Sequence, residues 1–285
     1  MVQIEDLTPW TAKSPLNPPC SRNALDRMVA AMGRSIGTTA ESLLFYADGQ
    51  QSADAFGLRL LRLSEVADAM ALLVEIVEPR AELVRHVVPI ATNDNGVFLA
   101  TFADGPLCDL VTLFSTSDLD PVPRFSGFVE ATRAVFGLQS ELAEAGRTDD
   151  FDGEVLSLSD FPRGVFDAGR CDALLSSHAV DERSQRMLLR AAAFLVPVGD
   201  SGRLGQLSEH PEGAVREAAV EALRDWPEEL AVPRLVKAAT EDESKNVRIV
   251  AAVALRRRQG ALAREARASV REHLGSLALY LGSDA

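Results

Sequence analysis

Apolar residues recur at helical spacing near the start of the chain. Leu25, Met28, Val29 and Met32 follow the i, i+3, i+4, i+7 pattern of an amphipathic helix, and Gly33 stands where a helix cap is expected. The first twenty residues hold four prolines, which disfavour regular structure. The pattern therefore predicts an extended lead-in followed by a helix that ends at Gly33.

A second helix is predicted to begin near Thr38 or Thr39 and to end at the turn dipeptide Asp48-Gly49. Thr38 and Glu41 have the spacing of a capping box, in which the side chain at the helix start accepts a hydrogen bond from a backbone N–H three residues later. This spacing assigns the start of the helix to the threonine pair.

Alternating and short apolar segments follow, and they are typical of β-strands. The predicted strands are residues 56–63, 87–91, 96–103 and 110–116, with helices near 64–77 and 125–136. The sequence NDNG at 93–96 predicts a tight hairpin turn. The order helix, helix, strand, helix, three strands, helix indicates an α+β fold with a small antiparallel sheet and flanking helices.

The last third of the chain contains an internal repeat. Residues 215–223 and 247–255 match at an offset of 32, and a second helical pattern precedes each of them. Self-similarity at this period is typical of an all-α solenoid, in which pairs of helices stack. Two more helical patterns, near 184–196 and 261–277, are predicted to close the stack at its ends.

These patterns divide the chain into an α+β domain over residues 1–140, an acidic connector over 141–184 and helical repeats over 185–285. The 285 residues carry a net charge of −13, with 29 basic and 42 acidic side chains. Residues 201–285 are neutral, so the acidity lies in the rest of the chain. Because affinity for nucleic acid comes largely from Lys and Arg at phosphates, we expect no nucleic-acid partner.

The repeated segment resembles HEAT repeats over roughly residues 185–280. In both copies Val-Arg opens the second helix, and alanine and leucine follow at fixed spacing. The resemblance implies a stack of helical hairpins and carries no information about chemistry.

Two groups of arginines in the repeats have a structural interpretation that needs no ligand. Arg216 and Arg248 occupy equivalent repeat positions and are predicted to pair with acids of an adjacent turn. Arg256, Arg257 and Arg258 could suggest a nucleic-acid patch, but consecutive residues on a helix point about 100° apart. They are expected to complement the helix dipole and to form surface ion pairs.

Residues 15–137 resemble the SUKH superfamily, the fold of fungal cell-wall-assembly regulators and of many bacterial toxin-immunity proteins. The resemblance rests on YADGQ at 46–50, FGLRLLRLSEVADAM at 56–70, VVPIATNDNGVFLATF at 87–102, GPLCDLVTLF at 105–114 and paired phenylalanines at 125–136. Ala47 stands where the family usually has His or Asn. The resemblance implies a protein that is not an enzyme. In bacteria it implies an inhibitor of a toxin, often a nuclease, and in fungi a regulatory hub.

The residues themselves offer no recognisable catalytic or cofactor site. The four histidines and three cysteines lack metal-ligand spacing, and no glycine-rich phosphate loop is present, so we expect neither a metal nor a cofactor. No apolar run is long enough to span a bilayer and the N-terminus does not resemble a secretory signal. The sequence therefore predicts a cytoplasmic protein without a membrane partner.

Acidic residues at the ends of predicted strands are the one conspicuous surface signal. They are Asp94, Asp104, Asp109, Asp118 and Asp120. Three interpretations remain open: a solvated face, a surface that binds a basic protein, or a general acid and base pair. We take the basic-protein surface as the candidate partner-binding site, because an acidic inhibitor complements the positive field of a nuclease.

Two functions from different classes follow, with a third kept in reserve. The first is a non-enzymatic immunity protein whose acidic strand ends occlude the active site of a basic toxin domain. The alternative is an intracellular scaffold or regulator that binds partners through its HEAT-like repeats. The third, an enzyme, would require turnover that depends on Asp104 or Asp109.

Overall fold

The computed structural model describes Trp10 and residues 15–50, 58–76, 85–93, 96–116, 121–144, 168–197, 200–258 and 260–281. The chain divides into two compact units. The sheet unit comprises Met1–Asp167 and Ser176–Leu188, and the repeat unit comprises Ala168–Leu175 and Leu189–Ala285. The predicted three-part division stays a prediction, because much of the predicted connector lies outside the described residues.

The first helix of the sheet unit forms as its pattern predicts. α2 (Arg22–Met32) begins after Ser21, whose Oγ accepts a hydrogen bond from the Ala24 N–H at 3.2 Å. It ends at Gly33, which has a φ of 67°. A left-handed residue with no Cβ terminates a helix without steric cost, so the predicted glycine cap is confirmed.

The second helix, α3 (Gly37–Tyr46), does not begin with the predicted capping box. Its N-cap residue is Ile36, which gives no side-chain cap, and Ser35 Oγ accepts a hydrogen bond from the Gly37 N–H at 3.0 Å. The Thr38 hydroxyl donates instead to the Asp109 carboxylate at 2.9 Å. The capping-box prediction is wrong because the Thr38 hydroxyl bonds to Asp109, a residue distant in sequence, and does not cap the helix.

A glycine turn follows α3 where Asp48-Gly49 predicts one. Gly49 has a φ of 75°, and a Cβ at this position would lie 2.7 Å from the Arg62 backbone nitrogen. Asp48 Oδ1 accepts a hydrogen bond from the Leu63 N–H at 2.6 Å, at the start of α4 (Leu63–Ile76). The turn therefore joins the end of one helix to the beginning of the next.

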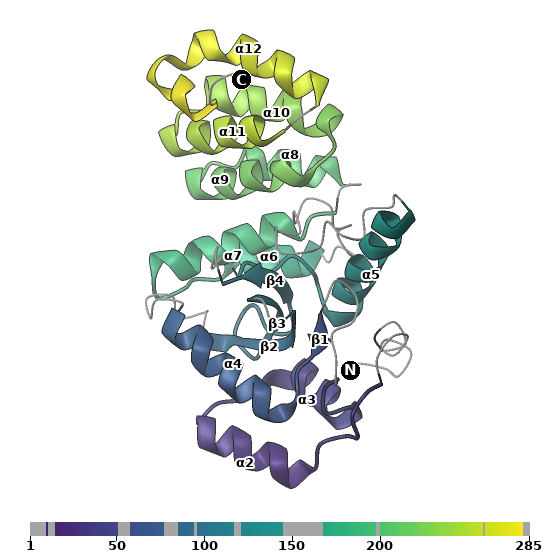
Figure 1. Cartoon of the computed structure of the whole chain (residues 1–285). Coiled ribbons are helices and arrows are strands. Elements are labelled where there is room, and N and C mark those ends of the chain that lie inside the picture. Colours follow the sequence, from purple (N-terminus) through teal and green to yellow (C-terminus); the bar gives the residue numbers. More distant parts are fainter. Residues whose placement is uncertain are drawn as a thin grey trace. The chain divides into compact units, whose positions relative to one another are not determined.

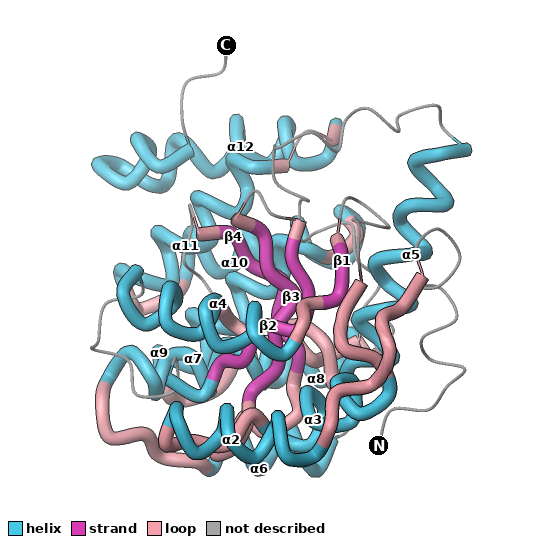
Figure 2. Tube along the Cα trace, turned by 60° about the horizontal axis from the view of Figure 1, so that its bottom comes forward, coloured by secondary structure: helices cyan, strands magenta, loops and turns pink. Residues whose placement is uncertain are grey.

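Four antiparallel strands form one sheet in the order β1-β2-β3-β4 (Figure 2). They are β1 (Arg59–Leu60), β2 (Val87–Thr92), β3 (Val97–Phe102) and β4 (Val111–Ser115). The three longer strands confirm their predicted positions. β1 is shorter than the predicted 56–63, because α4 already begins at Leu63, and residues 56–57 lie outside the described part.

The hairpin between β2 and β3 confirms the turn predicted from NDNG. Asn93 Oδ1 accepts a hydrogen bond from the Val97 N–H at 3.0 Å, and Gly96 has a φ of 89°. β2 also carries a register shift between Pro89 and Ala91. Proline has no N–H to donate to a ladder, and Pro89 stands next to this bulge, in a part of β2 that has no register partner in β1.

Helices cover the sheet and fix the segment before it. α3 and α4 contact β2, and α5 (Phe128–Glu144) contacts β4 (Figure 1). Trp10 is fully buried: its ring centroid lies 5.3 Å from that of Phe136, and its Nε1 donates to Thr132 Oγ1 at 3.2 Å. The buried Gln50 donates to the Trp10 carbonyl. The proline-rich lead-in is thus attached to the core at Trp10.

The described residues after α5 form helices alone. They are α6 (Ala168–Ser176), α7 (Glu182–Phe194), α8 (Ser201–Ser208), α9 (Gly213–Ala222), η6 (Leu223–Asp225), α10 (Glu228–Glu241), α11 (Lys245–Arg257), α12 (Ala261–Leu274) and η7 (Gly275–Leu281). α8 packs on α9 and α10 on α11, and the second pair stacks on the first (Figure 1). An α+β part followed by a helical part is therefore the architecture.

Small residues at equivalent positions allow the stacked helices to approach. Ala219 and Ala251, one repeat apart on α9 and α11, are both fully buried. Ala222 and Ala254 are likewise buried. These pairs keep the offset of 32 seen in the sequence, so the repeat predicted the contact surface as well as the helices.

Candidate functional site

The acids predicted to bind a partner have different places in the structure. Asp94, Asp118 and Asp120 lie outside the described residues. Asp109, at a φ of 61°, accepts hydrogen bonds from Thr38 Oγ1 and Thr39 Oγ1, both at 2.9 Å. Its carboxylate therefore stabilises the start of α3, a role that the sequence pattern did not reveal.

Asp104 follows β3, and its Oδ1 contacts Nδ1 of His86, which precedes β2. Its side chain is 55% exposed. Asp104 and Asp109 belong to the same stretch of chain after β3, but each carboxylate has its own internal partner. Their role toward a partner protein stays a prediction.

The repeat unit contains a groove of about 840 Å³ between α8 and α10. It reaches the turns that follow these two helices. The wall that α8 contributes is made mostly of small residues, Ser201, Gly202, Gly205 and Ser208. Glycine within a helix costs about 1 kcal/mol relative to alanine, so two glycines in an eight-residue helix weaken it. Because these residues are small, the space between α8 and α10 is not filled by side chains of α8.

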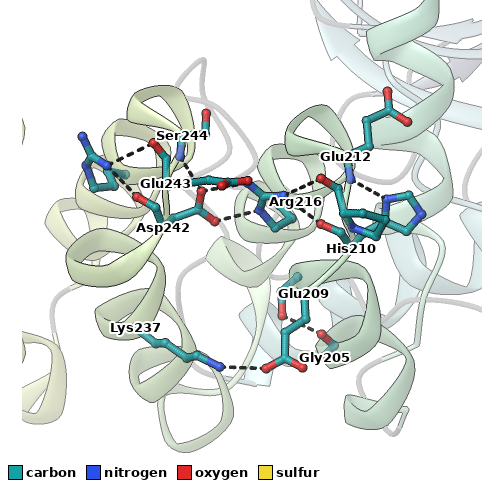
Figure 3. Close-up of polar contacts among 12 residues, drawn as sticks. Gly205, Glu209, His210, Glu212, Arg216, Lys237, Asp242, Glu243 and Ser244 are labelled. Carbon is teal, nitrogen blue, oxygen red and sulfur yellow. Dashed lines mark hydrogen bonds and ion pairs between the residues drawn. The ribbon is translucent and has the colours of Figure 1, made fainter.

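Charged side chains bridge the groove from the α10 side. Lys237 Nζ lies 2.8 Å from Glu209 Oε1, and the hydrogen bond between them lowers the pKa of Glu209 and raises that of Lys237 (Figure 3). Arg234 donates to the Ser201 carbonyl at 3.3 Å. The groove thus presents both charge signs along its length.

A largely buried ion pair at the groove joins the two repeats. Arg216 on α9 holds Asp242 with two parallel hydrogen bonds, Nε to Oδ2 at 2.9 Å and Nη2 to Oδ1 at 3.0 Å (Figure 3). Both side chains are only 9% exposed. The hydrogen bonds to Asp242 raise the pKa of Arg216. Burial alone would raise the pKa of Asp242, but the bonds from Arg216 and the Ser244 N–H outweigh it and lower that pKa.

The same arginine position recurs in the next repeat with a related set of acceptors. Arg216 Nη1 donates to the carbonyls of His210 and Pro211, six and five residues before it. Arg248 Nη1 donates to the carbonyls of Asp242 and Glu243 at the same separations. Pairing with acids of an adjacent turn is confirmed for Arg216. Arg248 instead bonds to the backbone of its own turn.

Within the described part of the chain, no group of three or more His, Cys, Asp or Glu side chains is placed to hold a metal ion. Burial raises the pKa of the Cys171 thiol, which keeps it in its less nucleophilic form. Among the same described residues, no helix is long and apolar enough to cross a bilayer.

The groove itself was not predicted from the sequence. One signal was available: α8 has the sequence SGRLGQLS, and two glycines three residues apart on an amphipathic helix indicate space beside it. The distance between α8 and α10, which makes that space a groove, is a property of tertiary packing.

Comparison with protein families finds HEAT repeats over residues 202–276, from α8 to the start of η7. The match covers about a quarter of the chain and identifies the repeats of this part. The comparison found no match to the SUKH superfamily, so that resemblance stays a prediction. Comparison with curated proteins found no match.

Proposed function

We propose that this protein is a non-enzymatic scaffold that binds a partner protein through its HEAT repeats. The observation that carries the proposal is the HEAT match over residues 202–276, which falls on the stacked helix pairs that border the groove. Stacked repeats provide an extended surface for protein partners, since each repeat adds side chains to the same face. The groove between α8 and α10 is the docking position within that surface.

The composition of the groove supports this proposal. Its walls combine small, polar and oppositely charged side chains, and the rim carries the exposed Glu209 and Lys237. Such a mixture is typical of protein interfaces that form and dissociate, which are as polar as ordinary protein surface. Arg216 and Asp242 beneath it fix the relative position of the two repeats, so the groove is preorganised.

The sheet unit enters the proposal only as a second surface. Its α+β architecture is compatible with the SUKH resemblance, and the resemblance is what suggests an immunity protein directed against a toxin. That finer function has no observation of its own in support and stays a prediction.

A substitution that fills the groove tests the proposal. Gly205 has an ordinary backbone conformation, and a Cβ there would meet Arg234 at 3.6 Å, a normal van der Waals contact. Gly205→Leu should therefore fold and place a branched side chain in the groove. In an affinity capture from the native cells, followed by titration of the captured protein, we expect at least about tenfold weaker binding.

Gly127→Leu, which precedes α5, is the matched control, because nothing lies within 4 Å of a Cβ at that position. It should bind the partner like the unaltered protein. Capture of a partner that Gly205→Leu leaves unaffected, or a partner held by the sheet unit alone, would contradict the proposal.

A further inference from the structure

Charge is distributed very unevenly within the repeat unit. Residues 245–281, from the start of α11 to the end of η7, carry eight basic and two acidic side chains, a net charge of +6. The rest of the chain therefore carries −19. α11 itself has the sequence KNVRIVAAVALRR and contains no acidic residue. The last repeat is a basic end on an acidic protein.

The solvent-facing side of α11 is also partly apolar. Ile249, Val250 and Val253 are half-buried and lie at i, i+1 and i+4, on one face of the helix. The fully buried residues of α11, among them Val247 and Leu255, lie toward the neighbouring helices. An aliphatic strip on the exposed side is thus available for contact.

Basic side chains surround this strip. Lys245, Arg256 and Arg257 are exposed at the two ends of α11, and Arg248 is half-buried on the flank of the helix, about 100° around the axis from Ile249. We call the strip and these four cations the α11 face. It combines an aliphatic centre with a basic border.

Arg248 shows which chemical group fits this face. Its equivalent, Arg216, holds Asp242, the residue that caps α10. The residue that caps α12 at the corresponding place is Gly275, which has no carboxylate. In the described part of the chain, Nη1 donates both side-chain hydrogen bonds of Arg248. Its Nε and Nη2 are not among the buried nitrogen atoms that lack a partner, so these two nitrogens are accessible to solvent. Within the described part of the chain, Nε and Nη2 of Arg248 thus have no hydrogen-bond acceptor, whereas the same two nitrogens of Arg216 bond to a carboxylate.

We propose that the α11 face binds an acidic helical segment of the partner protein, with a carboxylate of that segment on Arg248 and its apolar residues on the aliphatic strip. This inference rests on the proposed scaffold function and names the chemistry of the partner. An Arg fork and a carboxylate match in geometry, as Arg216 and Asp242 demonstrate in this chain.

Other anionic ligands fit the face less well. Single-stranded nucleic acid binds to stacking platforms, but α11 has no aromatic residue. Insertion into a membrane needs protruding apolar side chains, whereas Ile249, Val250 and Val253 are half-buried.

Fluorescence anisotropy with the full chain tests the proposal. The probe is a labelled amphipathic peptide that has glutamates at both ends and leucines at helical spacing between them, and a second peptide has glutamine in place of each glutamate. We expect saturable binding of the first peptide and at least about tenfold weaker binding of the second. Arg248→Gln should weaken binding of the first peptide about tenfold, and Arg256→Gln/Arg257→Gln several-fold. Arg27→Gln, an exposed arginine on α2 with the same charge change, should leave it within about twofold.

The exposed pair Arg256 and Arg257 keeps the test independent of folding, since their removal leaves no buried group unpaired. Absence of saturable binding, equal affinity for both peptides, or tighter binding of a single-stranded oligonucleotide or of phosphatidylserine vesicles would overturn the inference. A captured natural partner that requires Gly205 but binds Arg248→Gln normally would overturn the inference alone, whereas failure to capture any partner through the repeats would overturn the scaffold function.

Discussion

The sheet unit and the repeat unit use their polar side chains in different ways. In the sheet unit the polar contacts described above each occur once: Gln50 bonds to Trp10 and Leu60, and Asp109 bonds to two threonines of α3. In the repeat unit an arginine at one position makes the same backbone contacts in two successive turns.

This difference decides what each unit reveals about function. Where a contact is repeated, one copy can be compared with the other. Arg248 makes the backbone contacts of Arg216 but lacks its carboxylate partner in the described part of the chain, and the comparison reveals this difference. A contact that occurs once allows no such comparison. The carboxylate of Asp109 has a structural explanation, and nothing among the described residues of the sheet unit distinguishes a further role for it.

The largest expected effect tests whether the two units are separate cooperative structures. Phe102 on β3 is fully buried, and its replacement by alanine should reduce the stability of the sheet unit by about 4 kcal/mol through lost contacts and a cavity. Hydrogen exchange measured by mass spectrometry should show lost protection in β2 and β3 and unchanged protection in α9 and α11. Equal loss of protection in both units would show that the chain unfolds as one structure. Val180→Ala, at a side chain that is 90% exposed, is the control.

Local patterns in the sequence predicted most elements of the fold. The apolar spacing before Gly33 predicted α2, the alternation predicted β2, β3 and β4, and the offset of 32 predicted the pairing of α9 with α11. Each of these signals depends on residues a few positions apart, or on a repetition that needs no knowledge of distance in space.

The parts that were missed depend on residues far apart in the chain. Thr38 has the spacing of a helix cap, yet its hydroxyl bonds to Asp109, 71 residues later. The groove requires the separation of α8 from α10, and its ion pair joins Glu209 to Lys237, 28 residues apart. Neither contact leaves a periodic trace in the sequence.

The buried ion pair between the repeats gives the next largest effect. Asp242→Asn removes the charge from a hydrogen-bonded pair that is 9% exposed, and we expect a loss of about 2 kcal/mol in the free energy of unfolding at pH 7. Burial alone would raise the pKa of Asp242, but the hydrogen bonds from Arg216 and from the Ser244 N–H lower it. A carboxylate whose pKa is lower in the folded state stabilises above its unfolded pKa, about 3.9, and loses this contribution as the pH falls through the folded pKa.

Urea titrations from pH 7 to pH 3 should therefore show a constant difference between Asp242→Asn and the unaltered protein down to about pH 5, and a shrinking difference below about pH 4. Glu243→Gln, at a side chain that is 83% exposed, is the matched control and should have little effect. A difference that persists unchanged at pH 3 would mean that the charge of Asp242 does not carry the stabilisation.

A smaller effect is expected at the Asp109 contact of the sheet unit. Asp109→Ala removes the acceptor of Thr38 and Thr39 and places alanine at a φ of 61°, which together should cost about 1–2 kcal/mol. Asp109→Asn keeps an acceptor oxygen and tolerates this backbone conformation, so thermal unfolding should show a smaller loss. Equal losses in the two variants would show that the carboxylate charge, and not its geometry, holds α3.

The smallest structural effect should come from the ion pair across the groove. Glu209 and Lys237 are more than half exposed, so solvent and salt screen their attraction, and Glu209→Gln and Lys237→Gln should each shift the melting temperature by less than about 1 °C at physiological salt. The same two variants remove charge from the rim of the groove, where a bound partner would exclude water and strengthen each contact. The affinity for the captured partner, measured by titration, should therefore change in both variants, while the melting temperature stays nearly the same. If instead both variants bind normally and Gly205→Leu does not, the partner recognises the shape of the groove and not its charge.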